Sequence, residues 1–117
     1  MIDMKELERL KIFTAKEKML LQRCRDVIHL EPGAKVILYG SRVRGNSDPE
    51  SDYDLLILTD KDFNFKREDL FRRQLFPIEL ETGIVLTINV YSRHKWDSPL
   101  YRAMPFHQNI ERDGVIL

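Results

Sequence analysis

The apolar positions of this chain fall into segments with two different periods. Residues 14–30 place apolar side chains on one helical face, which predicts an amphipathic helix. Residues 36–39 and 55–58 are short apolar runs, which predict buried strands. The second run is uninterrupted, so we expect that strand to be covered on both faces and central in its sheet. Residues 84–91 are β-branched and apolar, which predicts a third strand.

Polar residues, glycine and proline mark the ends of these segments. Thr14 followed by Glu17 is the pattern of a capping box, which begins the first helix. Residues 32–33, proline and glycine, would end it. Residues 46–51 are rich in turn formers and predict a loop. Apolar residues between positions 7 and 13 favour a short additional helix before the first one.

The second half of the chain predicts three more helices. The first spans 65–81, contains Pro77, which is expected to kink or split it, and ends at Gly83. A short helix at 93–100 carries Trp96, and a last one at 104–112 is stopped by a glycine. The inner face expected for the longest of these helices consists of Leu70, Phe71, Leu75 and Ile78.

This order of elements predicts an α/β (α+β) fold with a small mixed sheet of about three to four strands and helices packed on it. The 117 residues suffice for one domain, 1–117, and 43% of them are hydrophobic. The 19 basic and 19 acidic residues balance, so nothing in the net charge favours a nucleic acid partner. No apolar run approaches the ~18 residues of a membrane span, and the lone Cys24 suits a reducing cytoplasm.

Gly40-Ser41 follows the first predicted strand and is a candidate for binding phosphate. Glycine lets the backbone approach a ligand, and a helix beginning at Ser41 would direct free N–H groups toward an anion. Arg42 and Arg44 are cations close by. The alternative is an ordinary turn from strand to helix, with the serine as a cap.

Asp52 and Asp54 open the second predicted strand and are candidate metal ligands. Residues two apart in a strand point to the same side, roughly 6–7 Å apart, so both carboxylates face one way. Mg²⁺ prefers oxygen ligands and is usually shared with the phosphates of a substrate. The alternative is a pair of solvated acids at the end of a strand.

Together the two motifs are more specific than either alone. Ten residues separate Ser41 from Asp52, which is enough for the chain to return beside the first strand. The string GSRVRGNSDPESDYDLLIL at 40–58 resembles the signature of the minimal nucleotidyltransferases, a family within the DNA polymerase beta-like nucleotidyltransferase superfamily. The segments after residue 60 are compatible with small members of that family.

The resemblance implies a reaction and a set of residues. Gly40, Ser41 and Arg42 would bind the nucleotide, and Asp52 and Asp54 would be the catalytic residues and hold Mg²⁺. The implied activity is transfer of a nucleoside monophosphate from a nucleoside triphosphate, ATP by expectation, to a hydroxyl group.

One feature departs from the pattern of the family. Its members usually carry a third acid on the strand after the long helix, whereas residues 84–91 contain no carboxylate. Thr87 occupies the acidic place by pattern and Asn89 is next in line, and neither serves as a base at neutral pH. Glu79 and Glu81 are nearby acids, but their spacing does not support them as substitutes.

Two functions therefore remain open. The chain is similar to minimal nucleotidyltransferases that act as antitoxins by adenylylating a toxin of the HEPN type, and a chain of this length suits a protein acceptor or a separate substrate-binding subunit. The alternative is a catalytically weakened binding module that neutralises its partner by contact alone. His29, His94 and His107 show no zinc spacing, and Cys24 is expected in the core.

Overall fold

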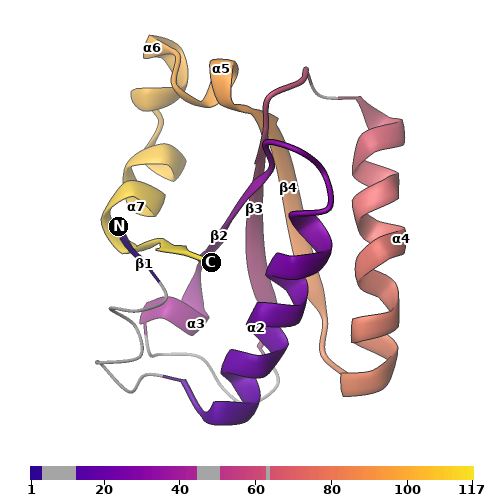
Figure 1. Cartoon of the computed structure of the whole chain (residues 1–117). Helices are drawn as coiled ribbons and strands as arrows, with labels where there is room; N and C mark the ends of the chain where they lie inside the picture. Colours follow the sequence, from indigo (N-terminus) through magenta and orange to yellow (C-terminus); the bar gives the residue numbers. More distant parts are fainter. Residues whose placement is uncertain (4–12, 45–50, 63) are drawn as a thin grey trace.

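The computed structural model describes residues 1–3, 13–44, 51–62 and 64–117. Its centre is a mixed sheet in the order β1-β5-β2-β3-β4, which confirms the predicted fold class (Figure 1). Most of the helix expected before residue 14 and of the loop expected at 46–51 lies outside the described residues. No helix in the described ranges is long and apolar enough to cross a membrane.

Three strands form the body of the sheet. They are β2 (Lys35–Tyr39), β3 (Tyr53–Thr59) and β4 (Leu86–Ser92), and β3 is antiparallel to β2 and parallel to β4. The central position expected for the second strand is confirmed, since β3 is buried along most of its length. β4 begins two residues later than the sequence pattern indicated.

Two further strands were not predicted. β1 (Ile2–Asp3) and β5 (Val115–Ile116) pair in parallel beside β2, and each is two residues long. Segments this short have no readable alternation, so the sequence pattern gave no signal for them. β5 is positioned by its pairing with β2, which the Leu117 N–H extends by donating to the Val36 carbonyl at 3.0 Å, and β1 is positioned by its pairing with β5.

The helices α2 (Ala15–Ile28) and α4 (Phe65–Thr82) cover one face of the sheet. The capping box predicted for α2 is present, with Thr14 and Glu17 each accepting the other's backbone N–H. On α4, Phe71, Leu75 and Ile78 are buried, and Gly83 ends the helix with φ +72°. These contacts make the larger of the two hydrophobic clusters.

Two features of α4 differ from what the sequence pattern indicated. The helix is continuous through Pro77, so of the kink or split expected there the split does not occur. Pro77 is exposed, so water can satisfy the carbonyl that loses its helical partner. Leu70 is 45% exposed and does not belong to the inner face, because the buried stripe of Phe71, Leu75 and Ile78 leaves it at the margin.

Three short helices cover part of the opposite face. They are α5 (Arg93–Trp96), α6 (Pro99–Arg102) and α7 (Pro105–Asp113), so the single helix expected at 93–100 is two separate turns. Ser98 begins the second turn by accepting the Tyr101 N–H. Trp96 is buried in the smaller hydrophobic cluster with Leu56 and Leu58 of β3. These helices cover the end of β3, while Asp52 is exposed and Asp54 half-buried at its beginning.

Candidate functional site

The two candidate motifs meet at one end of the sheet. Tyr39 pairs with Asp54 across β2 and β3, so the residue after Tyr39 lies beside that carboxylate. Gly40 has φ +86°, and a Cβ built on it would lie 2.2 Å from Asp54 Oδ2. Only glycine fits there without displacing the carboxylate, since its backbone tolerates positive φ and it has no side chain.

Ser41 begins a single helical turn, α3 (Ser41–Arg44). The Val43 and Arg44 N–H groups both donate to the Gly40 carbonyl, which closes the turn directly after β2. Val43 packs on the larger hydrophobic cluster and anchors the turn from inside. Ser41 is half-buried and Arg44 is exposed, and the two are three residues apart on one side of the turn.

Asp54 and Thr87 are directly paired across β3 and β4. The Thr87 hydroxyl donates to Asp52 Oδ2 at 3.3 Å. A threonine that hydrogen-bonds to the acid pair thus stands at the position where the family pattern has a third acid. Burial and then the charge of Asp52 raise the pKa of Asp54, and Arg44 opposes this effect. A carboxylate that burial and a neighbouring negative charge destabilise is a suitable ligand for a cation.

The side chains at this end of the sheet offer oxygen atoms as possible metal ligands. The carboxylates of Asp52 and Asp54 are hard ligands of the type that Mg²⁺ takes, and the Asp54 carboxylate packs directly against the backbone of Gly40. These residues therefore fit a divalent cation shared with a ligand. Within the described ranges, no group of three or more His, Cys, Asp or Glu side chains is arranged to hold a metal by itself.

The acids considered as substitutes lie elsewhere. Glu79 accepts the Leu86 N–H at 3.0 Å, and Glu81 forms an ion pair with Arg23 at 2.7 Å. Asn89 points to the same face of β4 as Thr87, but its amide donates to the Tyr39 hydroxyl at 2.7 Å. Thr87 is thus the β4 residue that contacts the acid pair.

Arg42 is directed toward α2 and the start of β3. Its Nε and Nη2 donate to the Ser51 carbonyl at 3.1 and 2.7 Å, which joins the two ends of the ten-residue connection. Its guanidinium lies 4.3 Å from the centre of the Tyr53 ring, and Nη1 is 3.7 Å from Glu17. These contacts fix the residue after Ser41 to the residue before Asp52.

Glu17 and Tyr53 were not identified from the sequence as residues that support the site. The Tyr53 hydroxyl donates to Glu17 at 3.0 Å, and Tyr53 is 3% exposed behind the two acids. Burial and then the bond to Glu17 raise the pKa of Tyr53 to about 12, so its hydroxyl stays protonated and donates. Its position was the available signal: because side chains alternate along a strand, the residue between two acids that face outward points into the core.

The remaining reactive side chains lie away from this end of the sheet. Cys24 is fully buried, and burial raises the pKa of its thiol to about 12, which agrees with the core role expected for it. His107 is buried and stacks on Trp96 with ring centres 4.2 Å apart. His29 and His94 are exposed at the ends of helices.

Comparison with known proteins gives two matches. The family model described as "Nucleotidyltransferase domain" matches residues 17–112. A protein of Methanocaldococcus jannaschii named "putative protein adenylyltransferase" is 35% identical over 83 residues, which covers 71% of this chain and 76% of that protein. The range matched by the family model contains every candidate residue from Gly40 to Asn89.

Proposed function

This chain belongs to the nucleotidyltransferase domain family, and we propose that it transfers the adenylyl group of ATP to a hydroxyl group of another protein. The observation that carries the proposal is the contact between Gly40 and the carboxylate of Asp54. It brings a phosphate-binding turn and an acid pair to one point, and this is the arrangement that transfer from a nucleoside triphosphate requires.

Each residue of the site has a separate role in this proposal. Gly40 admits the triphosphate close to the backbone, and the Ser41 hydroxyl donates to a phosphate oxygen. Arg44, exposed on the same side of the turn, adds a positive charge beside the phosphates. Arg42 bonds to the Ser51 carbonyl and lies over the Tyr53 ring, which fixes the turn after Gly40 relative to the two acids.

Asp52 and Asp54 are the proposed ligands of Mg²⁺, which when bound neutralises phosphate charge and polarises the phosphoryl group. In the reaction, the acceptor oxygen forms a bond to the α-phosphorus, and the bond from that phosphorus to the bridging oxygen breaks. Pyrophosphate leaves with the electron pair of that bond, and the hydroxyl proton passes to water. The site residues act by orienting and neutralising rather than by forming a covalent intermediate.

Support for a protein acceptor comes from two sources. The relative from Methanocaldococcus jannaschii carries the name of a protein adenylyltransferase. Asp52 is also exposed at the start of β3, so a large acceptor can reach its carboxylate. A toxin of the HEPN type, implied by the sequence resemblance, is the first acceptor to test.

A second candidate function rests on Thr87. Its hydroxyl donates a hydrogen bond to Asp52, and it stands where a third carboxylate would assist the attacking hydroxyl. The alternative is therefore a slow enzyme that acts mainly by binding its partner. The alternative predicts that Asp52→Asn leaves the effect on the partner intact.

The test is transfer of label from ATP labelled at the α-phosphate. The wild-type protein, Asp54→Asn and Ser41→Ala are each incubated with Mg²⁺ and the candidate partner, and ATP binding is measured in parallel by calorimetry. We expect labelled partner with the wild type and a loss of label of about 10²-fold or more with Asp54→Asn. Binding of ATP without label on any partner would support the binding module, and no Mg²⁺-dependent ATP binding would overturn adenylyl transfer.

A further inference from the structure

The outer edge of β4 is open. β4 is the last strand in the sheet order, and β3 is its only partner strand within the described ranges. The Val85 carbonyl accepts the Tyr53 N–H, whereas the Leu86 N–H turns outward to Glu79. Because backbone groups alternate in direction along a strand, those of Ile88 and Val90 also point outward. They are a template for a further strand.

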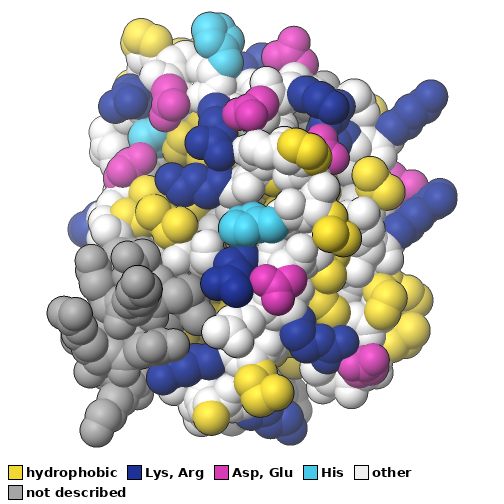
Figure 2. Space-filling view, in the orientation of Figure 1, with side chains coloured by type: hydrophobic (Ala, Val, Ile, Leu, Met, Phe, Trp, Pro, Cys, Tyr) yellow, Lys and Arg dark blue, Asp and Glu magenta, His cyan; other side chains and the backbone are white. Residues whose placement is uncertain are grey.

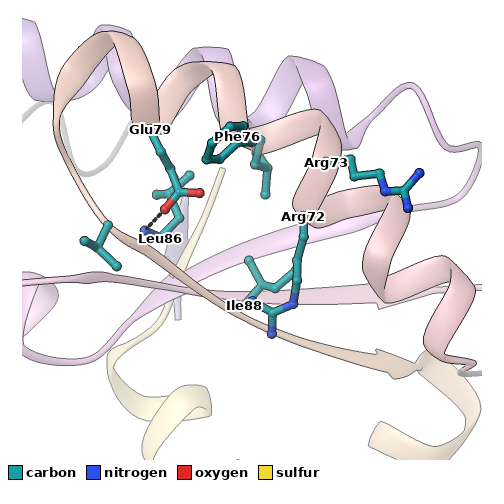
Figure 3. Close-up of a pocket in the computed structure, with 8 residues that line it drawn as sticks. Arg72, Arg73, Phe76, Glu79, Leu86 and Ile88 are labelled. Atoms are coloured by element: carbon teal, nitrogen blue, oxygen red, sulfur yellow. Dashed lines mark hydrogen bonds between the residues drawn. The ribbon is translucent and has the colours of Figure 1, made fainter.

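Two hollows follow this edge. The first, about 510 Å³, lies between α4 and β4, where Glu79 and Phe76 stand over the strand (Figure 3). The second, about 240 Å³, continues toward the end of β4. The first is lined by Arg72, Arg73, Leu75, Phe76, Glu79, Val85, Leu86 and Ile88. The second is lined by Glu68, Asn89, Val90, Tyr91, Ser92, Lys95 and Tyr101. Six of the seven β4 residues therefore border one hollow or the other.

The rim of the first hollow is apolar and exposed. Phe76 and Val85, which line it, are each 54% exposed. Leu80, one helical turn after Phe76 on α4, is 68% exposed. Figure 2 shows hydrophobic side chains gathered over the lower part of α4. An apolar groove between a helix and an open strand edge is the arrangement that binds an extended segment by strand addition. The edge supplies backbone hydrogen bonds, and the groove takes alternate side chains.

The charges along the groove favour an acidic segment. Glu79 is committed to the Leu86 N–H. Arg72 and Arg73 bridge to acids of their own helix, and these exposed pairs are weak enough to exchange for carboxylates of a partner. Lys95 adds a further exposed cation at the second hollow. An incoming segment with apolar residues in the groove and acids at its ends would complement this edge.

The same strand connects the groove to the candidate site. Thr87 is paired with Asp54 and bonds to Asp52, while its neighbours Leu86 and Ile88 line the groove. Adjacent strands lie about 4.8 Å apart, so a strand added to β4 would be about 10 Å from β3. Alternate side chains of that strand would point to the face that carries Asp52 and Asp54.

We propose that the acceptor protein docks by adding an extended, acidic and apolar segment to the edge of β4, which presents a hydroxyl side chain of that segment to Asp52 and Asp54. This inference rests on the proposed function and names how its acceptor is held. One set of alternate residues binds the groove under Phe76, and the other set faces the site past Thr87. The transfer step itself is unchanged.

A synthetic peptide of nine residues serves as the probe. Tyrosine and valine alternate in it between terminal glutamates, and serine and threonine versions replace the tyrosines. One derivative carries N-methyl groups on its valines and another on its tyrosines, so that each blocks backbone hydrogen bonds on one edge only. A peptide of the same composition with its valines and tyrosines in two blocks is the control.

We expect the wild-type protein to label the alternating peptide from α-labelled ATP, and the block peptide at least about tenfold less. Phe76→Glu, an exposed change outside the site, is expected to reduce labelling at least about tenfold, while ATP affinity measured without peptide stays within about twofold. Leu30→Glu, at a residue 72% exposed beyond the end of α2, is the matched control and should label like the wild type. One N-methylated derivative should be inactive and the other active.

Three results would overturn the inference. The first is labelling that Phe76→Glu leaves unchanged, or equal labelling of both N-methylated derivatives. The second is a wild-type protein that labels its partner protein from ATP but does not label the alternating peptide. The third is a wild-type dimer that Phe76→Glu converts to a monomer, which would assign the edge to a second copy of this chain. Absence of ATP binding would instead refute the proposed function, so the two failures are distinguishable.

Discussion

The hydroxyl of Tyr53 donates a 3.0 Å hydrogen bond to the carboxylate of Glu17, which joins the residue between the two acids to the first turn of α2. Glu17 simultaneously completes the capping box with Thr14 and lies 3.7 Å from Arg42. One carboxylate thus connects the start of a helix, the turn after Ser41 and the start of β3. This network leads to the first two predictions.

Tyr53→Phe is expected to weaken Mg²⁺-dependent ATP binding while lowering the free energy of unfolding by only about 0.5–1.5 kcal/mol. The ring stays in the core and under Arg42, but the bond to Glu17 is lost. Calorimetry and urea unfolding measure the two effects. Glu31→Gln, which removes a comparable pair with Arg67 away from the site, is the control and should leave ATP affinity unchanged. Equal losses of ATP affinity in both variants would contradict a positioning role.

The stability provided by Glu17 should depend on pH. Burial raises its pKa, but the backbone of Thr14, the hydroxyls of Tyr53 and Thr14 and the charge of Arg42 outweigh this and lower it from 4.5. A carboxyl with a lowered pKa stabilises the fold above its unfolded pKa, and this contribution is lost as pH falls through its folded pKa. Urea unfolding of the wild type and Glu17→Gln should therefore differ more at pH 7 than at pH 3. A difference independent of pH would refute this.

Gly40→Ala should abolish nucleotide binding for a reason separate from backbone strain. The new Cβ would lie 2.2 Å from Asp54 Oδ2 and push the carboxylate away. Gly83→Ala is the matched control, because Gly83 also has positive φ but has no atom within 4 Å of an added Cβ. Both variants should lose about 1 kcal/mol or more of stability, and only Gly40→Ala should lose ATP binding in calorimetry.

Thr87→Asp should increase the rate of adenylyl transfer. The new carboxylate would replace a hydroxyl directly opposite Asp54, and a positioned base typically contributes about 10²–10⁴-fold. Single-turnover measurements with saturating ATP isolate this step. Thr87→Val, which removes the hydroxyl and adds no charge, is the control. A rate no faster in Thr87→Asp than in Thr87→Val would show that a third acid has no role here.

Cys24 should resist alkylation in the folded protein. Its thiol is fully buried and its pKa is raised to about 12, so almost no thiolate forms at pH 8. Iodoacetamide labelling followed by mass spectrometry should modify the protein only as urea unfolds it. Alkylation in native buffer at the rate of a free thiol would contradict a core position for this residue.

The sequence by itself determined the elements that carry the site. The spacing of apolar residues predicted α2, β2, β3 and the greater part of α4, because these segments are long enough for their period to be read. Glycine, serine and two aspartates at a spacing of ten residues predicted the candidate site, and the structure brings Gly40 and Asp54 together. The absence of an acid on β4 was equally visible, since it depends only on residue identity.

Only the tertiary structure decided which side chains contact the candidate site and which are bonded elsewhere. Arg42 follows Ser41 directly, yet its guanidinium is held by Ser51, Tyr53 and Glu17, while Arg44 remains exposed. Glu79 and Glu81 are near β4 in sequence but bond elsewhere. The open edge of β4 follows from the order of strands. These relationships join residues far apart in sequence. The local sequence pattern does not predict them, because they are set by packing and not by periodicity.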